Sequence, residues 1–234
     1  MKKVVLLALA ALALTSYTAT AQTRGERYPG MYEEKPQTIV IMPPINRTTH
    51  AEAKDYFYTT LYMPLCEKGY YVYSPSLTME LFQQESGYDA ERFIEGDLTT
   101  FRDVLGADAA MFTIIKDWSR LNALGLLTVD IEYILRSTKT GQTLYHREGE
   151  ITIDKSFDET DEDGNKKQKG FGEMMMGLVM NAINTAATDK IVAGRECSSQ
   201  VLSDLPVGKY SSRYEQDAGD SAGPDILVAT IKKL

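Results

Sequence analysis

Three consecutive polar residues, Asn46, Arg47 and Thr48, are the side chains in this 234-residue sequence best placed to bind a small ligand. They follow an apolar run typical of a buried strand, and they precede Thr49-x-x-Glu52, which has the spacing of a helix-capping box. Ligands of α/β proteins bind where strands end, and helix N-termini favour anions. The pattern therefore predicts a ligand site at Asn46, Arg47 and Thr48, with ordinary helix capping as the alternative.

The sequence contains two cysteines and two histidines. Outside the cytosol two thiols can form one bridge, so Cys66 and Cys197 are disulfide candidates, with two separate buried thiols as the alternative. A Cys66–His50 dyad is excluded, because sixteen residues of one helix separate the two by about 24 Å. A pairing of Cys197 with His146 stays open, although nothing in the pattern positions a third catalytic group.

Residues 158–170 resemble part of a calcium-binding loop, with Glu159, Asp161 and Asp163 alternating. Position twelve of such a loop requires a bidentate glutamate, and here it is Gly170. A solvated loop of paired opposite charges is therefore the favoured interpretation. The chain also lacks a P-loop, a G-x-G-x-x-G motif and zinc-ligand spacing. We predict a protein that is not an enzyme, with no catalytic residue, no metal and no cofactor.

The apolar run at residues 38–42 predicts a central strand buried on both faces, because it has no polar alternation. Prolines stand before and after this run, where a missing N–H does not interrupt a strand ladder. Further strands are predicted at residues 70–73, 109–118, 127–135 and 143–153, the last two as a hairpin. With helices between the first strands, this order predicts an α/β (α+β) fold: a mixed sheet of about five strands with helices packed on it.

We expect this α/β domain to span residues 36–197, after a flexible lead-in at residues 22–35. Residues 172–193 predict a methionine-rich helix, packed on the sheet or, as the alternative, exposed as an adaptable partner surface. Residues 198–234 predict a tail over the surface that ends in a strand at 225–231. A terminal strand needs a sheet edge to pair with, either its own or a neighbour's.

The N-terminus has the pattern of a secretory signal peptide over residues 1–21. A short cationic start precedes eleven apolar residues, and small residues then predict cleavage between Ala21 and Gln22. The apolar run is too short to span a bilayer, and no second one approaches that length. We therefore expect an exported, periplasmic protein without a transmembrane segment. No cysteine lies near the cleavage region, so a lipid anchor has no attachment atom there.

The chain carries a formal net charge of −8. Removal of the cationic leader would make the mature protein more acidic still. A surface of this charge repels phosphate backbones and anionic headgroups, which excludes nucleic acid and a basic membrane-binding face.

Four segments, taken in order, carry a resemblance to a known family: Ile39 to Asn46, Gly69 to Val72, Leu105 to Ala110 and Leu205 to Tyr210. Together they resemble an uncharacterised family of Gram-negative envelope lipoproteins known as domain of unknown function 799. The resemblance implies a fold like the TolB N-terminal domain, related to the curli secretion lipoprotein, and a non-enzymatic envelope role. It also implies outer-membrane assembly partners, among them a curli-secretion-like lipoprotein. The family's lipidated cysteine is absent from Leu14 to Thr18.

The leading hypothesis is an exported accessory protein of the bacterial envelope that works through protein–protein contacts, with a homo-oligomer also open. The candidate contact surfaces are the terminal strand and the segment from Leu205. A periplasmic small-ligand-binding protein that uses Asn46 to Thr48 is the second hypothesis, and an unrecognised hydrolase is a remote third.

Overall fold

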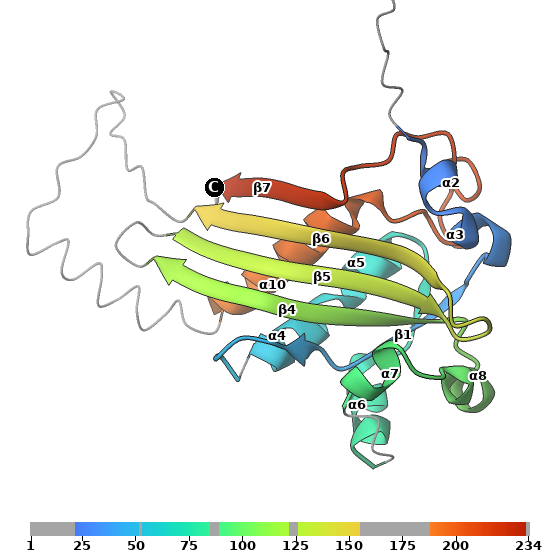
Figure 1. Ribbon diagram of the computed structural model, residues 1–234, viewed down its shortest axis with the longest axis horizontal. Helices are drawn as coiled ribbons and strands as arrows, with labels where there is room; N and C mark the ends of the chain where they lie inside the picture. The colour runs from blue at the N-terminus through green and yellow to red at the C-terminus, as the bar shows by residue number, and fades with distance from the viewer. Residues whose placement is uncertain (1–21, 52, 85–88, 122–125, 155–187, 233–234) are drawn as a thin grey trace, which may run out of the picture.

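The strand predicted at residues 38–42 lies inside a seven-stranded mixed sheet. The computed structural model describes residues 22–51, 53–84, 89–121, 126–154 and 188–232 (Figure 1). Strand β1 (Thr38–Ile41) pairs in parallel with β3 (Tyr71–Val72) on one side and with β4 (Ala109–Leu121) on the other. The prediction of a central strand is confirmed.

The rest of the sheet is built outward from β4. The two-residue strand β2 (Ile45–Asn46) pairs with β4 in parallel, whereas β5 (Leu126–Ser137) and β6 (Thr143–Asp154) follow as antiparallel neighbours. The last strand, β7 (Ile226–Lys232), runs parallel to β6, and the sheet order is β3-β1-β4-β5-β6-β7. The mixed α/β fold, the hairpin and the terminal strand are therefore confirmed, and β2 is an additional strand that the sequence did not predict.

Helices cover both faces at the β1 end of the sheet. One core contains Ile39 and Ile41 of β1 and lies under α3 (Pro29–Glu34), α4 (Ala53–Thr60), α5 (Tyr62–Glu67) and α10 (Thr188–Val201). The other contains Val40 and Met42 and lies near α6 (Pro75–Gln84), α7 (Glu91–Ile94) and α8 (Thr99–Leu105). Successive residues of β1 thus point into opposite cores, which explains why that run is uniformly apolar.

Strands β5, β6 and β7 have helices behind them. In Figure 1 their broad face is turned toward the viewer, and α5 and α10 lie behind it. Along β5, buried residues alternate with half-buried ones from Leu126 to Leu135, as expected for a strand with one face in the core.

The expected flexible lead-in at residues 22–35 is wrong for this structure. Those residues form α2 (Arg24–Arg27) and α3, and the side chains of Tyr28 and Met31 are buried. Thr23 and Glu26 close a capping box at the start of α2. Local polarity suggested a loop, but contacts with the distant C-terminal segment hold these short helices in place.

The boundary expected at residue 197 falls inside α10, which continues to Val201 and then into the short 3-10 helix η2 (Leu202–Asp204). Leu202, Leu205 and Asp217 are buried, so the C-terminal segment belongs to the domain rather than lying over its surface. No helix among the described residues is long and apolar enough to cross a membrane. The predicted signal peptide, its cleavage site, the acidic segment at 158–170 and most of the helix expected at 172–193 lie outside the described residues.

Candidate functional site

The predicted ligand corner at Asn46, Arg47 and Thr48 is a closed set of local hydrogen bonds. Asn46 Oδ1 accepts from the backbone N and the Oγ1 of Thr48, at 3.0 and 2.8 Å, and Asn46 Nδ2 donates to the carbonyl of His50 at 2.7 Å. The hydroxyl of Thr48 in turn accepts from the N–H of His50. Side-chain turns of this kind compete with helix formation, and α4 accordingly begins at Ala53 rather than at Thr49.

A hollow of about 200 Å³ lies beside this corner. Its lining includes Asn46, Lys54, Asp89 and Glu91, and Glu91 pairs with Arg47 at 3.3 Å. Two carboxylates in such a lining disfavour an anion, because like charges repel at short range. The structure thus gives the corner a structural role, and ligand binding there stays a prediction.

The two cysteines are free thiols, Cys197 buried and Cys66 half-buried. Burial, followed by the charge of Glu196, raises the pKa of the Cys197 thiol to about 12, so it stays protonated at neutral pH. Cys197 packs in the core with Tyr145, whereas the next residue of β6, His146, points to the other face and is exposed. The sheet therefore separates Cys197 from His146, which removes that catalytic pairing.

His146 instead joins a charged cluster on the face of the sheet opposite α10 and Cys197. Donor atoms of Glu132, His146 and Glu148 lie within 4.8 Å of one another, a geometry that could hold a metal ion. The ammonium of Lys116 lies 3.0 Å from Glu132 Oε2 and 2.7 Å from Glu148 Oε2. Burial raises the pKa of Glu132, but hydrogen bonds from Lys116 and His146 outweigh it and lower that pKa below its usual value. The lysine thus supplies the positive charge that a divalent cation would otherwise provide.

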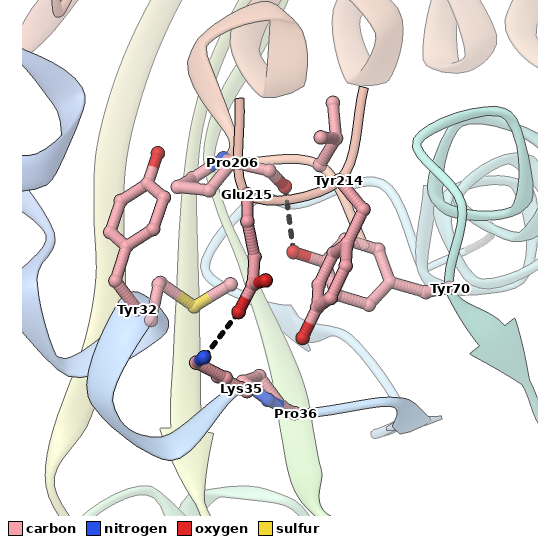
Figure 2. A pocket seen from close by; sticks show the side chains of 9 residues that line it. Tyr32, Lys35, Pro36, Tyr70, Pro206, Tyr214 and Glu215 are labelled. Atoms are coloured by element: carbon pink, nitrogen blue, oxygen red, sulfur yellow. Dashed lines mark hydrogen bonds and ion pairs between the residues drawn. The ribbon is translucent and has the colours of Figure 1, made fainter. Parts of the chain in front are cut away.

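A second hollow, which the sequence did not predict, has a lining suited to an apolar side chain. We call it the tyrosine socket, and its volume is about 150 Å³. Its lining residues come from the end of α3, from the residue before β3 and from the C-terminal segment: Met31, Tyr32, Lys35, Pro36, Tyr70, Pro206, Val207, Tyr214 and Glu215. Figure 2 shows Tyr32 on one side, with Tyr70 and Tyr214 on the other.

An ion pair spans the tyrosine socket. Glu215 extends between the rings to the ammonium of Lys35, and each side chain is half exposed (Figure 2). The hydrogen bond from Lys35 to the Glu215 carboxylate raises the pKa of Lys35. Among the described residues, Lys35 and Glu215 are also the two non-glycine residues with positive φ, at 50° and 61°. Left-handed backbone at such residues costs about 1–2 kcal/mol each.

A buried carboxylate, that of Asp217, holds the residues on one side of the socket in position. Asp217, which is fully buried, accepts from the Tyr32 hydroxyl at 3.3 Å, from the Val207 N–H at 2.9 Å and from Arg24 Nη1 at 3.2 Å. Burial and the Asp217 carboxylate raise the pKa of the Tyr32 phenol, which keeps it protonated and donating. The hydroxyl of Tyr70 donates to the carbonyl of Pro206 at 2.6 Å. Both of these hydroxyls therefore bond within the protein, and the rings present apolar surface.

Two of the sequence segments that carry the family resemblance meet beside this socket. The N–H of Gly208 donates to the carbonyl of Lys68, and the N–H of Tyr210 donates to the carbonyl of Gly69. A Cβ at residue 208 would lie 2.4 Å from the Gly69 carbonyl oxygen, so only glycine permits this approach. The ordered motifs Gly69 to Val72 and Leu205 to Tyr210 were thus the signal that could have located the site, but the sequence does not show that they touch.

The outer edge of β7 is a second exposed feature. Leu227, Ala229 and Ile231 pack toward the helix-side core. Ile226 and Val228 point the other way and are 48% and 71% exposed. No described strand pairs with the outer side of β7. An edge strand with exposed apolar residues is a template for pairing with another chain.

Comparison with known proteins gives the chain a family. Residues 27–206 match the family model described as "Putative lipoprotein GNA1162-like". A curated relative, "Putative lipoprotein NMB1124/NMB1162" of Neisseria meningitidis serogroup B, is 22% identical over 190 residues, which are 80% of this chain and 84% of that protein.

Two solved structures are among those to which the chain is similar. The crystal structure of lipoprotein GNA1162 from Neisseria meningitidis is 21% identical and has a TM-score of 0.47, covering 64% of this chain and all of that one. A PelC dodecamer from Paraburkholderia phytofirmans is 11% identical with a TM-score of 0.42, covering 75% of this chain and 91% of that one. The family match over residues 27–206 places the chain in a family: it belongs to the proteins described as "Putative lipoprotein GNA1162-like".

Proposed function

We propose that this protein is an exported accessory protein of the bacterial cell envelope that works by binding another protein, and that β7 is its docking edge. The observation that supports this most is the outer side of β7, with which no strand of the described ranges pairs, and the exposed Val228 near its centre. An added strand gains main-chain hydrogen bonds along such an edge, and pockets beside it give specificity. Family membership supports the envelope setting.

The edge shows little of the protection that soluble proteins give to exposed strands. Proline and inward-pointing charges blunt such edges in other proteins. The strand contains no proline, and its one charged residue, Lys232, is at its end. The seven residues of β7 pair with β6 along their whole length, so the edge is long and regular.

Capture of partners from envelope extracts tests the proposal. Val228→Lys places a charge at the edge without removing a core contact, so the free energy of unfolding should change by no more than about 0.5 kcal/mol. The matched control is Val104→Lys on α8, because Val104 is 66% exposed and Figure 1 shows α8 at the opposite end of the molecule from β7. We expect wild type and Val104→Lys to retain a stable partner and Val228→Lys to lose it.

A wild-type chain that captures no partner, or a Val228→Lys chain that captures the same one equally well, would contradict this function. The curli-secretion-like partner implied by the family resemblance remains a prediction that the same capture can identify. A ligand-dependent thermal shift in the absence of any partner would instead support the small-ligand alternative.

A further inference from the structure

We propose that the tyrosine socket binds a single six-membered aromatic ring carried by a side chain of the partner protein. That the carrier is a protein rests on the proposed function. The ring chemistry rests on the socket alone.

The volume of the socket limits what can enter. Pockets for cofactors and drug-sized molecules measure about 300–1,000 Å³. The tyrosine socket is about 150 Å³, too small for a nucleotide, a disaccharide or a folded peptide. A dry apolar cavity of about 150 Å³ in another protein accepts benzene. The size therefore allows one side chain no larger than a six-membered ring.

The lining favours an aromatic ring over a charged or polar group. Three tyrosines and two prolines surround the space, with Met31 buried at its side. Aromatic pairs in tilted or edge-to-face contact add about 0.5–1.5 kcal/mol beyond the area that they bury. A thioether beside a ring is also favourable. The Tyr32 and Tyr70 hydroxyls already donate to Asp217 and to Pro206, so these rings offer their apolar surface to a guest.

The rim has the character expected at the edge of an interface. Lys35 and Glu215 are half exposed, and an ion pair of that exposure contributes only about 0–1 kcal/mol. Moving the Glu215 side chain aside to admit a ring between the tyrosines therefore costs little (Figure 2). A buried apolar anchor surrounded by a polar rim is the usual arrangement of an interface hot spot.

Titration of the purified full-length chain with 4-methylphenol, which reproduces a tyrosine side chain, tests the ring chemistry. We expect a dissociation constant on the order of 1 mM for so small a ligand, with NMR shifts at Met31 and Val207. The saturated analogue 4-methylcyclohexanol is the matched probe, and it should bind at least several-fold more weakly, because it lacks a π face.

Three substitutions test whether this binding takes place in the socket. Val207→Phe fills the space with a ring of its own and should weaken 4-methylphenol binding at least tenfold. Val104→Phe adds the same ring at an exposed site on α8 that does not line the socket, and it should leave the binding unchanged. Glu215→Gln removes the ion pair but keeps the lining, so this variant should still bind 4-methylphenol. It provides a second test of the socket if Val207→Phe fails to fold.

The outcomes separate this proposal from the proposed function. If 4-methylphenol binds no better than its saturated analogue, or shifts resonances away from the socket, the ring site is overturned while capture through β7 still stands. If Val207→Phe blocks the free ring but leaves partner capture unchanged, the protein carrier is overturned and the ring belongs to a small molecule. We expect Val207→Phe to lose both 4-methylphenol binding and partner capture, and Val104→Phe to keep both.

Discussion

Arg24 Nη1 lies 3.2 Å from Asp217 Oδ2, and this ion pair joins the first helix of the described chain to its C-terminal segment. The Arg24 side chain is 14% exposed, and the Asp217 side chain is fully buried. Arg24 also lies 3.4 Å from the buried Asp204. The two ends of the domain are therefore held together through charged groups that have little access to water.

Asp217→Ala should destabilise the protein by about 3–5 kcal/mol, the usual cost of removing one partner of a buried ion pair. The change also leaves the Tyr32 hydroxyl and the Val207 N–H without their acceptor. Urea unfolding at neutral pH measures the loss. Asp220→Ala is the control, because Asp220 lies 3.6 Å from the same arginine but is 35% exposed. It should cost less than about 1 kcal/mol, and equal losses for the two variants would contradict a special role for Asp217.

Gly149→Ala should be destabilising because β6 and α10 approach closely at this residue. A Cβ there would lie 2.2 Å from Val201 Cγ2, so one of the two elements must move, at a cost of about 1–3 kcal/mol. Combining it with Val201→Ala should recover part of this loss, and the double-mutant cycle should show a favourable coupling of about 1 kcal/mol or more. Gly219→Ala, where a Cβ would meet nothing within 4 Å, should be neutral. Strict additivity of the Gly149 and Val201 changes would contradict the contact.

Cys66 should react with a small alkylating reagent in the folded protein, and Cys197 should not. Cys197 is fully buried, and its pKa is raised to about 12, so at pH 8 almost no thiolate is present to react. Mass spectrometry after brief alkylation should find one label without denaturant and two labels in urea. Rapid double labelling of the native chain would contradict the burial of Cys197. A mass lower by two hydrogen atoms, with no label, would show that the predicted Cys66–Cys197 bridge forms after all.

The strands were predictable because each carries a local pattern. The uninterrupted run at Ile39 to Ile41 and the alternation along β5 report burial on two faces and on one face, respectively. The tyrosine socket was not predictable, since Tyr32, Tyr70 and Tyr214 come from three distant parts of the chain and show no shared periodicity.

The two short helices α2 and α3 were missed for a related reason. Helices of four and six residues are too short to be stable alone. Their local sequence therefore resembles a loop. The interactions that order them, such as Arg24 with Asp217, join residues nearly two hundred positions apart. Likewise, the helix expected to begin at Thr49 begins later because Asn46 and Thr48 use their side chains to bond the intervening backbone.

Lys68 should make stability depend on pH in a direction opposite to that of the buried tyrosines. Burial, followed by repulsion from Arg24, lowers the pKa of Lys68 to about 8, while its ammonium donates to the Ser203 carbonyl at 2.6 Å. Between about pH 8 and pH 10.5 the unfolded chain holds the proton and the folded chain releases it, so this group's contribution to stability rises with pH in that window. Burial raises the pKa of Tyr28 and Tyr58 to about 12, so their contributions fall above about pH 10.

Comparison with Lys68→Met isolates the lysine, because both proteins retain the tyrosines. The unfolding free energy of wild type minus that of the variant should increase by about 1–2 kcal/mol between pH 7.5 and pH 10, less than the full shift would give because the ammonium is partly exposed. Urea unfolding at several pH values in this range provides the measurement. A difference that stays flat, or that falls as pH rises, would show that the folded protein does not disfavour the charged form of Lys68.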